Sequence, residues 1–445
     1  MYAHLIRAIK WNTAGIILYK IILFTHQSFL FAFIPQTEYG ILGTIFSTIY
    51  FLIPVTNFGF DYTLLSFFKK NRSPEETNFI LKQYTYRVLT LLAVLGILSA
   101  CFFYVDFIQT KIPLLLFVTS LALFFIESLK HSLLTYAHIL HLNKKIALYE
   151  NVSLVAYVVI VWAYILLYKT TSFSLFILPL AITSALETAF IGHALVSAYK
   201  ELPQSAPKDT PTTRSFYHES FFNYINQLAK ALFSPNFLII LLAATVGFHK
   251  TGYIKFVTTL IIFLYNIFNR SIQMSGGALL SSISHMPTTL IKKTFNTITN
   301  YYTQTLLIIA IYFSGLVYFY SQTRSIAESS NHLSVHALII LFCLISFIEY
   351  GTLTYETLFI TQKYGRELAF INGINITGAV LIVLLSCFYP HPIFLLFLCV
   401  LKIGTVGYTI YRAHQIWNVS VDFSINATTI IIHLALALSL TNYFL

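Results

Sequence analysis

The sequence predicts an all-α protein that crosses a membrane many times. Hydrophobic residues make up 57% of the 445 positions and charged residues only 10%, whereas soluble domains carry about 25% charged residues. The mean hydropathy is +0.75, and the apolar residues come in blocks long enough for a membrane-spanning helix, which needs about 20 residues. The blocks are too long for barrel strands and lack a period of two. This composition argues against a water-soluble enzyme and predicts a polytopic helical membrane protein.

Thirteen apolar segments along the chain are long enough to span a membrane. They lie at residues 11–34, 40–68, 86–106, 112–140, 146–168, 173–199, 220–246, 251–275, 299–320, 333–360, 368–389, 391–414 and 424–444. The first segment carries Lys20 and His26 and has no small-residue cleavage pattern, so we expect an uncleaved span. The four cysteines fall inside apolar segments without metal-binding spacing, and we expect them to be core residues.

The basic residues set the orientation of the chain. With the N-terminus in the cytoplasm, eighteen of the 27 Lys and Arg residues lie on the cytoplasmic side and five on the other side. Cytoplasmic loops of membrane proteins collect Lys and Arg, so this bias explains the net charge of +11 without a nucleic-acid partner. We predict a multi-pass protein with a cytoplasmic N-terminus and no bound nucleic acid.

The longest polar stretch divides the chain into two halves. It runs from Glu201 to Arg214 and contains three prolines, so we expect an extended cytoplasmic linker. The predicted organisation is an N-terminal six-helix lobe at 1–200, a linker at 201–218, a C-terminal six-helix lobe at 219–415, and a thirteenth helix at 416–445.

The two halves are predicted to be repeats of each other. An offset of 212 residues pairs Gly40 with Gly252, and it also pairs Asn57 with Asn269. An offset of 219 pairs further positions in the fourth and fifth spans. Six spans per half give both halves the same orientation, so we expect two six-helix bundles related by a pseudo-two-fold axis along the membrane normal.

Polar residues of the first span recur every seven residues and therefore lie on one stripe. The stripe holds Asn12 and Thr13, Tyr19 and Lys20, and His26 and Gln27. Lys20 lies about 13–15 Å along the helix from the start of the span, which is near the bilayer midplane. A midplane lysine is predicted to line a polar cavity, the alternative being a lysine that extends to an interface.

The seventh span carries an equivalent stripe. Asn223, Gln227, Lys230 and Ser234 are spaced as neighbours on one helix face, and Pro235, which follows, is expected to kink the helix. Lys230 lies about 15 Å along this span, so both halves are predicted to carry a lysine at the same depth.

Charged residues in the fourth span leave two interpretations open. Glu127 is spaced to pair with Lys130 or His131 of its own helix, which would be a self-neutralising structural pair. The repeat makes Glu349 the counterpart of Lys130, and the two either pair across the interface of the halves or serve a coupling ion. Single charges in other spans, Glu187 and Lys402, are expected to be packing partners inside their bundles.

Polar residues near the cytoplasmic ends of the second and eighth spans form a candidate inner gate. Asn57 and Asp61 lie one turn apart in the second span, and Asn269 and Arg270 lie at the matching level of the eighth. The alternative is that Asp61 and Arg270 simply lie at the level of the lipid headgroups.

Several catalytic motifs are absent from the sequence. It has no P-loop motif, no H-E-x-x-H motif and no long polar loop with paired acids. We expect no enzymatic activity and no cofactor.

Three stretches, at residues 35–62, 135–151 and 363–372, resemble polysaccharide flippases of the O-antigen type, in the multidrug/oligosaccharidyl-lipid/polysaccharide exporter (MOP) superfamily. The first runs from Pro35 to Tyr50 and on to Asn57-Phe-Gly-Phe-Asp-Tyr62, where the family has a Tyr-Gly turn and a Gly-Leu-Asp-like segment. The second runs from Thr135 to Asn151 with its lysine pair, and residues 363–372 resemble the same family. The thirteenth span departs from the usual twelve.

The resemblance implies two lobes in a V around a central cavity, in the cytoplasmic (inner) membrane. The cargo would be a polyprenyl-diphosphate-linked oligosaccharide for surface polysaccharide or lipopolysaccharide biosynthesis, and the partners would be membrane lipids and a polysaccharide polymerase complex. We expect Lys20 and Lys230 to contact phosphate, and sugar hydroxyls to be bound by Asn12, Asn223, Gln227 and Asn269. Coupling to H⁺ or Na⁺, or gating, is assigned to Asp61, Glu127, Lys130, Arg270 and Glu349.

Three alternatives remain. A cation-coupled drug antiporter of the same fold predicts an acidic cavity, whereas the midplane stripes carry lysines. A membrane glycosyltransferase or polysaccharide polymerase predicts acids on a long outer loop, and the outer segment 321–332 has only Glu328. A scaffold without transport activity would not need midplane lysines.

Overall fold

The computed structural model describes most of the chain as helix. The described residues are 2–60, 63, 74–108, 114–140, 142–168, 173–201, 213–256, 259, 288–296, 341, 345, 348, 354–360, 362, 364–388 and 393–419. Within these ranges every regular element is helical and there is no strand. The predicted all-α fold class is confirmed.

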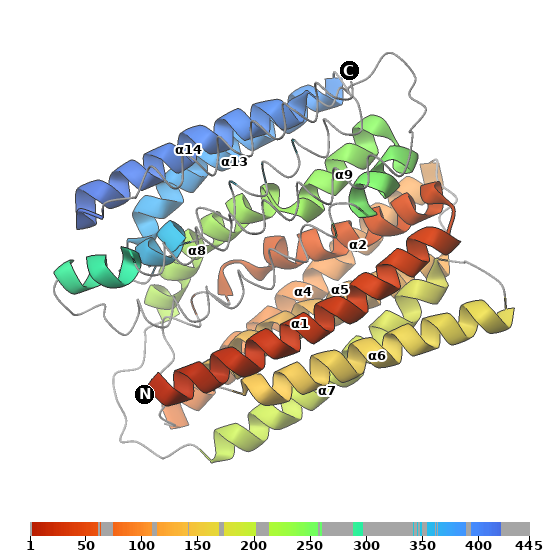
Figure 1. Cartoon of the computed structure of the whole chain (residues 1–445), viewed down its shortest axis with the longest axis horizontal. Coiled ribbons are helices and arrows are strands. Elements are labelled where there is room, and N and C mark those ends of the chain that lie inside the picture. The colour runs from red at the N-terminus through yellow and green to blue at the C-terminus, as the bar shows by residue number, and fades with distance from the viewer. Residues whose placement is uncertain are drawn as a thin grey trace. The chain divides into compact units, whose positions relative to one another are not determined.

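The described helices are labelled in chain order (Figure 1). Their bounds are α1 Tyr2–Phe33, α2 Gln36–Asn57, α4 Pro74–Ile108, α5 Leu114–Ile139, α6 Asn143–Tyr168, α7 Ser174–Lys200, α8 Thr213–Leu232, α9 Pro235–Val246, α13 Gly365–Phe388 and α14 Phe394–Trp417. Residues 248–256 are also helical.

Many of these helices are suited to a bilayer. Among the described residues, seven helices are long and apolar enough to cross a membrane, and a bent pair of helices forms an eighth candidate. They bear exposed apolar side chains, such as Leu166, Leu167 and Phe388, of the kind that lipid covers. The chain is therefore a multi-pass membrane protein. The predicted spans at 299–320 and 424–444 lie outside the described residues.

Contacts between helices group the chain into two compact units. The first unit holds Met1–His26 and Thr48–Gln227, and the second holds Gln27–Ser47 and Leu228–Leu445. The two units are defined by contacts between residues, whereas the lobes at 1–200 and 219–415 were predicted from the internal repeat of the sequence. The lobe boundaries therefore stay a prediction.

In the first unit, α5 packs against α7, α6 and α4, and α7 packs against α6. The middle of α1 crosses α6 closely, because a Cβ atom on Gly15 would lie 2.6 Å from the Cβ atom of Ala147. Asn151 Nδ2 donates a hydrogen bond of 3.1 Å to the carbonyl oxygen of Gly15. Helix α1 therefore packs against α6, which in turn contacts α5 and α7.

In the second unit, α13 and α14 run side by side (Figure 1). Gly378 leaves room for Leu401, whose Cδ2 would lie 2.6 Å from a Cβ atom at position 378. Thr405 donates a hydrogen bond of 2.7 Å to Asn375 Oδ1 in the buried interface. Polar pairing inside the bundle thus satisfies groups that lipid could not.

The seventh predicted span is broken at the position that the sequence indicates. Helices α8 and α9 meet at an angle of 48°, and α9 begins at Pro235, whose missing N–H group suits the first turn of a helix. The predicted kink is confirmed. The helix also starts at Thr213, so the last residues of the predicted linker are helical.

Replacing Ser234 by alanine is expected to weaken this break. The Ser234 Oγ accepts a hydrogen bond of 3.3 Å from the Phe237 N–H group and caps α9. Loss of such a cap costs about 1 kcal/mol, and chemical unfolding of the purified protein in detergent measures it. Ser197→Ala in the interior of α7 is the matched control, and an equal loss of stability there would contradict the capping role.

A second feature of the second unit is a crossing of bare backbones between α2 and residues 248–256. A Cβ atom on Gly40 would lie 2.0 Å from the Phe248 carbonyl oxygen, and one on Gly252 would lie 2.3 Å from the Gln36 carbonyl oxygen. Each glycine would also bring its Cβ atom to 3.0 Å from the backbone nitrogen of the other. The offset of 212 pairs Gly40 with Gly252 and Gln36 with Phe248, so it exchanges the first two contacts. The crossing therefore has the local two-fold symmetry that the predicted repeat requires.

Candidate functional site

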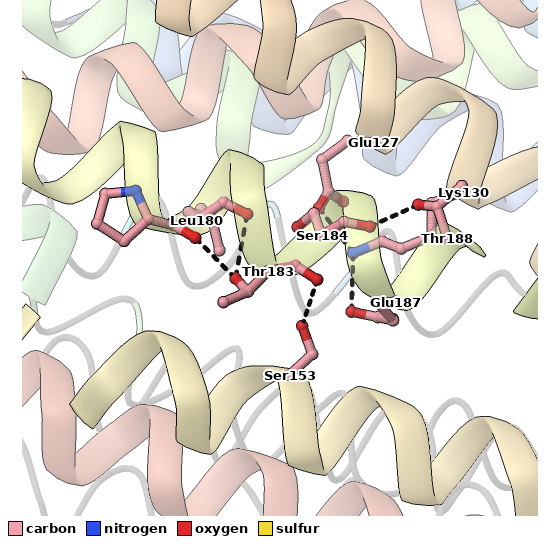
Figure 2. A network of polar contacts seen from close by, with 9 residues as sticks. Glu127, Lys130, Ser153, Leu180, Thr183, Ser184, Glu187 and Thr188 are labelled. Atoms are coloured by element: carbon pink, nitrogen blue, oxygen red, sulfur yellow. Dashed lines mark hydrogen bonds and ion pairs between the residues drawn. The ribbon is translucent and has the colours of Figure 1, made fainter. Parts of the chain in front are cut away.

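A network of charged and hydroxyl side chains lies inside the first unit, between α5 and α7 (Figure 2). The Lys130 ammonium donates a hydrogen bond of 2.6 Å to Glu127 Oε1, and Ser184 Oγ donates one of 2.5 Å to the same oxygen. Lys130 Nζ also lies 3.5 Å from Glu187 Oε2. The lysine therefore bridges two carboxylates that come from different helices.

The packing of the helices explains why these groups meet. Glu127 and Lys130 lie one turn apart on α5, and Ser184 and Glu187 lie one turn apart on the facing side of α7. Ser153 of α6 donates a hydrogen bond of 3.0 Å to the Thr183 carbonyl oxygen and joins α6 to the same region (Figure 2). Three helices thus hold the network.

Burial makes the charge of this network significant. Glu127 is 6% exposed and Glu187 is 5% exposed, while the side chain of Lys130 is 15% exposed. Two carboxylates and one ammonium carry a formal charge of −1. Among the described residues, Oε1 of Glu187 has no hydrogen-bond partner, so the negative charge is least compensated at this atom.

Tyrosines from other helices of the first unit lie near the network. Tyr19 of α1 and Tyr50 of α2 both lie within the electrostatic influence of Glu127 and Glu187. Tyr157 of α6 is 3% exposed and lies near both of these tyrosines. Polar aromatic side chains from α1, α2 and α6 are therefore grouped near the acidic network.

A buried histidine, His26, contacts one of these tyrosines. His26 Nδ1 accepts a hydrogen bond of 3.1 Å from Trp162 Nε1, and its ring meets Tyr157 edge-on with centroids 5.2 Å apart. Because Nδ1 is an acceptor, a neutral His26 ring carries its proton on Nε2. The sequence placed His26 on the polar stripe but gave no indication of Trp162, which lies in an apolar span.

Lys20 lies on α1 next to Tyr19 and is partly buried. Its Nζ is 5.8 Å from the centroid of the Tyr19 ring. The helix that carries Asn12 is described, but the Asn12 side chain lies outside the described part.

In the second unit, Lys230 is not isolated. Its Nζ lies 2.8 Å from Glu356 Oε2, and the side chains of Lys230 and Glu356 are 21% and 4% exposed. Nearby, the buried Lys402 places its Nζ 5.0 Å from the centroid of the Phe233 ring, at the break between α8 and α9. The expectation that Lys402 packs inside its bundle is confirmed.

Two of the predicted sugar-binding residues, Asn223 and Gln227, lie on α8 within the first unit. Asn223 Nδ2 donates a hydrogen bond of 3.0 Å to Thr63 Oγ1, beside the bond that Ser220 makes to the same atom. Gln227 is buried, and its Oε1 has no hydrogen-bond partner among the described residues. The amide of Asn223 is thus engaged in packing, while Gln227 has an acceptor to spare.

The remaining predicted site residues cannot be placed. Asp61, Asn269, Arg270 and Glu349 lie outside the described residues. Of the predicted pairs, the structure brings together Glu127 and Lys130. It adds Glu187, for which the cluster of polar residues at 183, 184, 187 and 188 in an otherwise apolar span was the available signal.

The whole chain is similar in fold to solved membrane transporters. The lipid II flippase MurJ, in an inward closed conformation, has a TM-score of 0.62 at 14% identity, with 97% of this chain and 98% of that chain covered. A MOP superfamily transporter from Pyrococcus furiosus has a TM-score of 0.62 at 11% identity, covering 92% and 95%. A MATE transporter from Vibrio cholerae has 0.62 at 11%, covering 93% and 97%.

The chain has the fold of the MOP transporters. At these identities the likeness concerns the fold alone. The resemblance to the MOP superfamily is thus confirmed at the level of fold, while the O-antigen branch stays a prediction. No sequence profile of a known protein family matches the chain, and no curated protein does.

Proposed function

We propose that this protein is a flippase that moves a polyprenyl-diphosphate-linked oligosaccharide across the cytoplasmic membrane by alternating access. The observation that carries the proposal is a pair of lysines, Lys20 on α1 and Lys230 on α8, a helix that forms a candidate bent span together with α9. A cation in a span is costly and is retained where it meets an anion or water. The MOP fold, which the lipid II flippase MurJ shares, supports the same proposal.

The chemistry of the cargo explains the need for these residues. A diphosphate with attached sugars cannot cross hydrocarbon unaided, because its charges and hydroxyl groups lose their water. Lysine ammonium groups stabilise phosphate by charge-assisted hydrogen bonds. Transport changes no covalent bond of the cargo, so the proposal includes no catalytic residue and no cofactor.

The Lys230–Glu356 ion pair fits this role as the unloaded state of a phosphate site. Glu356 neutralises Lys230 at 2.8 Å when no cargo is present. An incoming diphosphate carries more negative charge than one carboxylate and would take over the ammonium. In this scheme Lys20 supplies the corresponding contact in the first unit.

Other parts of the proposal follow the sequence. Sugar hydroxyls would be bound by Gln227, with its spare acceptor, and by Asn12, Asn223 and Asn269. A proton or Na⁺ gradient would drive turnover, with Asp61, Glu127, Lys130, Arg270 and Glu349 in coupling or gating. The N-terminus would be cytoplasmic, the lobes would be residues 1–200 and 219–415, and a polysaccharide polymerase complex would be the partner.

Charge reversal tests the phosphate role. In cells that need this protein for surface glycan, Lys20→Glu and Lys230→Glu are each expected to abolish glycan export while membrane insertion persists. Lys82→Glu, at an exposed position of α4, is the matched control and should leave export intact. Normal export in both test variants would contradict the proposal.

A cation-coupled drug antiporter of the same fold is the second candidate. The buried acidic network of Glu127 and Glu187 favours it, since a cationic drug needs an anionic partner. It predicts that the chain protects cells from lipophilic cations and that charge reversal at Lys20 leaves this protection unchanged. A test with such cations therefore separates the two functions.

A further inference from the structure

One carboxylate oxygen of the first unit is left without a partner. Oε1 of Glu187 has none among the described residues, although the residue is 95% buried, as its exposure of 5% indicates. Ser153 lies close enough to Glu187 to act on its charge, but its hydroxyl group donates its hydrogen bond of 3.0 Å to the Thr183 carbonyl oxygen. A buried ionised carboxylate with a free oxygen is costly and takes up a proton readily.

The other carboxylate is in the opposite situation. Oε1 of Glu127 accepts two short hydrogen bonds, from Lys130 at 2.6 Å and from Ser184 at 2.5 Å. Hydrogen bonds to the charged form stabilise it. Lys130 Nζ is also much closer to Glu127 than to Glu187, which it approaches only to 3.5 Å. The two acids therefore differ in their surroundings: Glu127 accepts two short hydrogen bonds at one oxygen, whereas the ammonium group of Lys130 approaches Glu187 only to 3.5 Å.

Lys130 occupies the place that a free cation would take between the two acids (Figure 2). An alkali-metal ion prefers several oxygen ligands, and here the two nearest carboxylates are already bridged by an ammonium group. The lysine thus supplies a permanent positive charge, and one negative charge remains to be neutralised.

We propose that Glu187 is a proton-binding site in the first unit, with Lys130 as its built-in counter-ion, so that a proton and not an alkali-metal ion neutralises the network. The proton comes from water and forms an O–H bond at Glu187 Oε1. The formal charge of the three groups changes from −1 to zero, and Lys130 stays with Glu127. The inference rests on the proposed transport function in one respect, because it identifies the proton as the ion to which that transport is coupled.

Other groups around Glu187 act on the same equilibrium. Glu150 on α6 and Glu127 on α5 add negative charge, and Lys130 adds positive charge. Tyr19 and Tyr50 lie within the influence of Glu187 from α1 and α2.

Infrared difference spectroscopy on the purified protein tests the proton site directly. We expect the C=O stretch of one buried carboxylic acid to appear as the pH falls, and to be absent in Glu187→Gln. Glu367→Gln, at the partly exposed start of α13, is the control and should keep the band. Glu187→Asp retains an acid and should shift the band. This variant replaces Glu187→Gln in the measurement if Glu187→Gln does not fold. A band that survives in Glu187→Gln, or moves with Glu127→Gln instead, would overturn the assignment.

Sodium tests the role of Lys130. Exchange of choline for Na⁺ at constant ionic strength is expected to leave the melting temperature of the native protein unchanged. In Lys130→Met the same exchange should raise the melting temperature, since Na⁺ then binds between Glu127 and Glu187. Stabilisation of the native protein by Na⁺, or none in Lys130→Met, would refute the counter-ion role.

These measurements need no cargo. A titrating Glu187 in a protein that exports no glycan would refute the proposed flippase and leave the proton site intact. Glycan export that persists in a protein whose Glu187 does not titrate would refute the proton site and leave the proposed flippase intact.

Discussion

Leucine in place of Gly252 is expected to force α2 away from residues 248–256 and to destabilise the second unit severely. The first atom of any side chain at position 252 would lie 2.3 Å from the Gln36 carbonyl oxygen and 3.2 Å from the Gly40 Cα atom. These are backbone atoms, which cannot rotate away as a side chain can. Overpacking costs about 1–3 kcal/mol where side chains can adjust, so we expect at least the upper end of this range, measured as a lower melting temperature in detergent.

Glycines in open positions provide the control for this prediction. A Cβ atom on Gly373, within α13, meets nothing within 4 Å. Gly373→Ala should be neutral or slightly stabilising, because alanine favours a helix by roughly 0.5–1 kcal/mol over glycine. Gly252→Ala should already be destabilising, and equal melting temperatures for Gly252→Ala and Gly373→Ala would contradict the tight crossing.

Removal of Lys130 is the second change with a large expected effect. Lys130→Met leaves Glu127 and Glu187 buried without the ammonium group that bridges them. Breaking a buried ion pair by deleting one partner costs about 3–5 kcal/mol. At neutral pH in choline buffer we expect a loss of stability of this order, seen as a lower yield of folded protein and a lower melting temperature.

Neutralising all three groups distinguishes charge from packing. The triple variant Glu127→Gln, Lys130→Met, Glu187→Gln has no uncompensated charge, and networks replaced in this way are often as stable as the originals. We expect the triple variant to recover most of the stability that Lys130→Met loses. A triple variant as unstable as the single one would mean that the methylene chain of Lys130, rather than its charge, is what the site requires.

Hydropathy predicted the existence of the helices better than their ends. The third predicted span starts at residue 86, whereas α4 starts at Pro74, because a helix continues through polar residues that the bilayer criterion ignores. The break at Pro235 was predictable from covalent structure, since proline lacks the N–H group that helix continuation needs.

The site was predictable only where its residues are neighbours on one helix. Glu127 and Lys130 are one turn apart on α5, and their pair was one of the interpretations that the spacing allowed. Periodicity fixes which face of a helix a residue is on, but not which helix covers that face. For this reason the contact of Lys130 with Glu187, and that of Lys230 with Glu356, could not be derived from the stripes.

The glycine crossing in the second unit has an implication for the origin of the chain. Each half contributes the same position to it, Gly40 or Gly252, and each glycine meets the carbonyl oxygen of the residue four places before the other. A half-turn exchanges the two sides of this contact, so both sides can be formed by the same surface of two identical chains. A half-length ancestor with this glycine could therefore make the same contact as a homodimer, before any gene duplication and fusion joined the two copies.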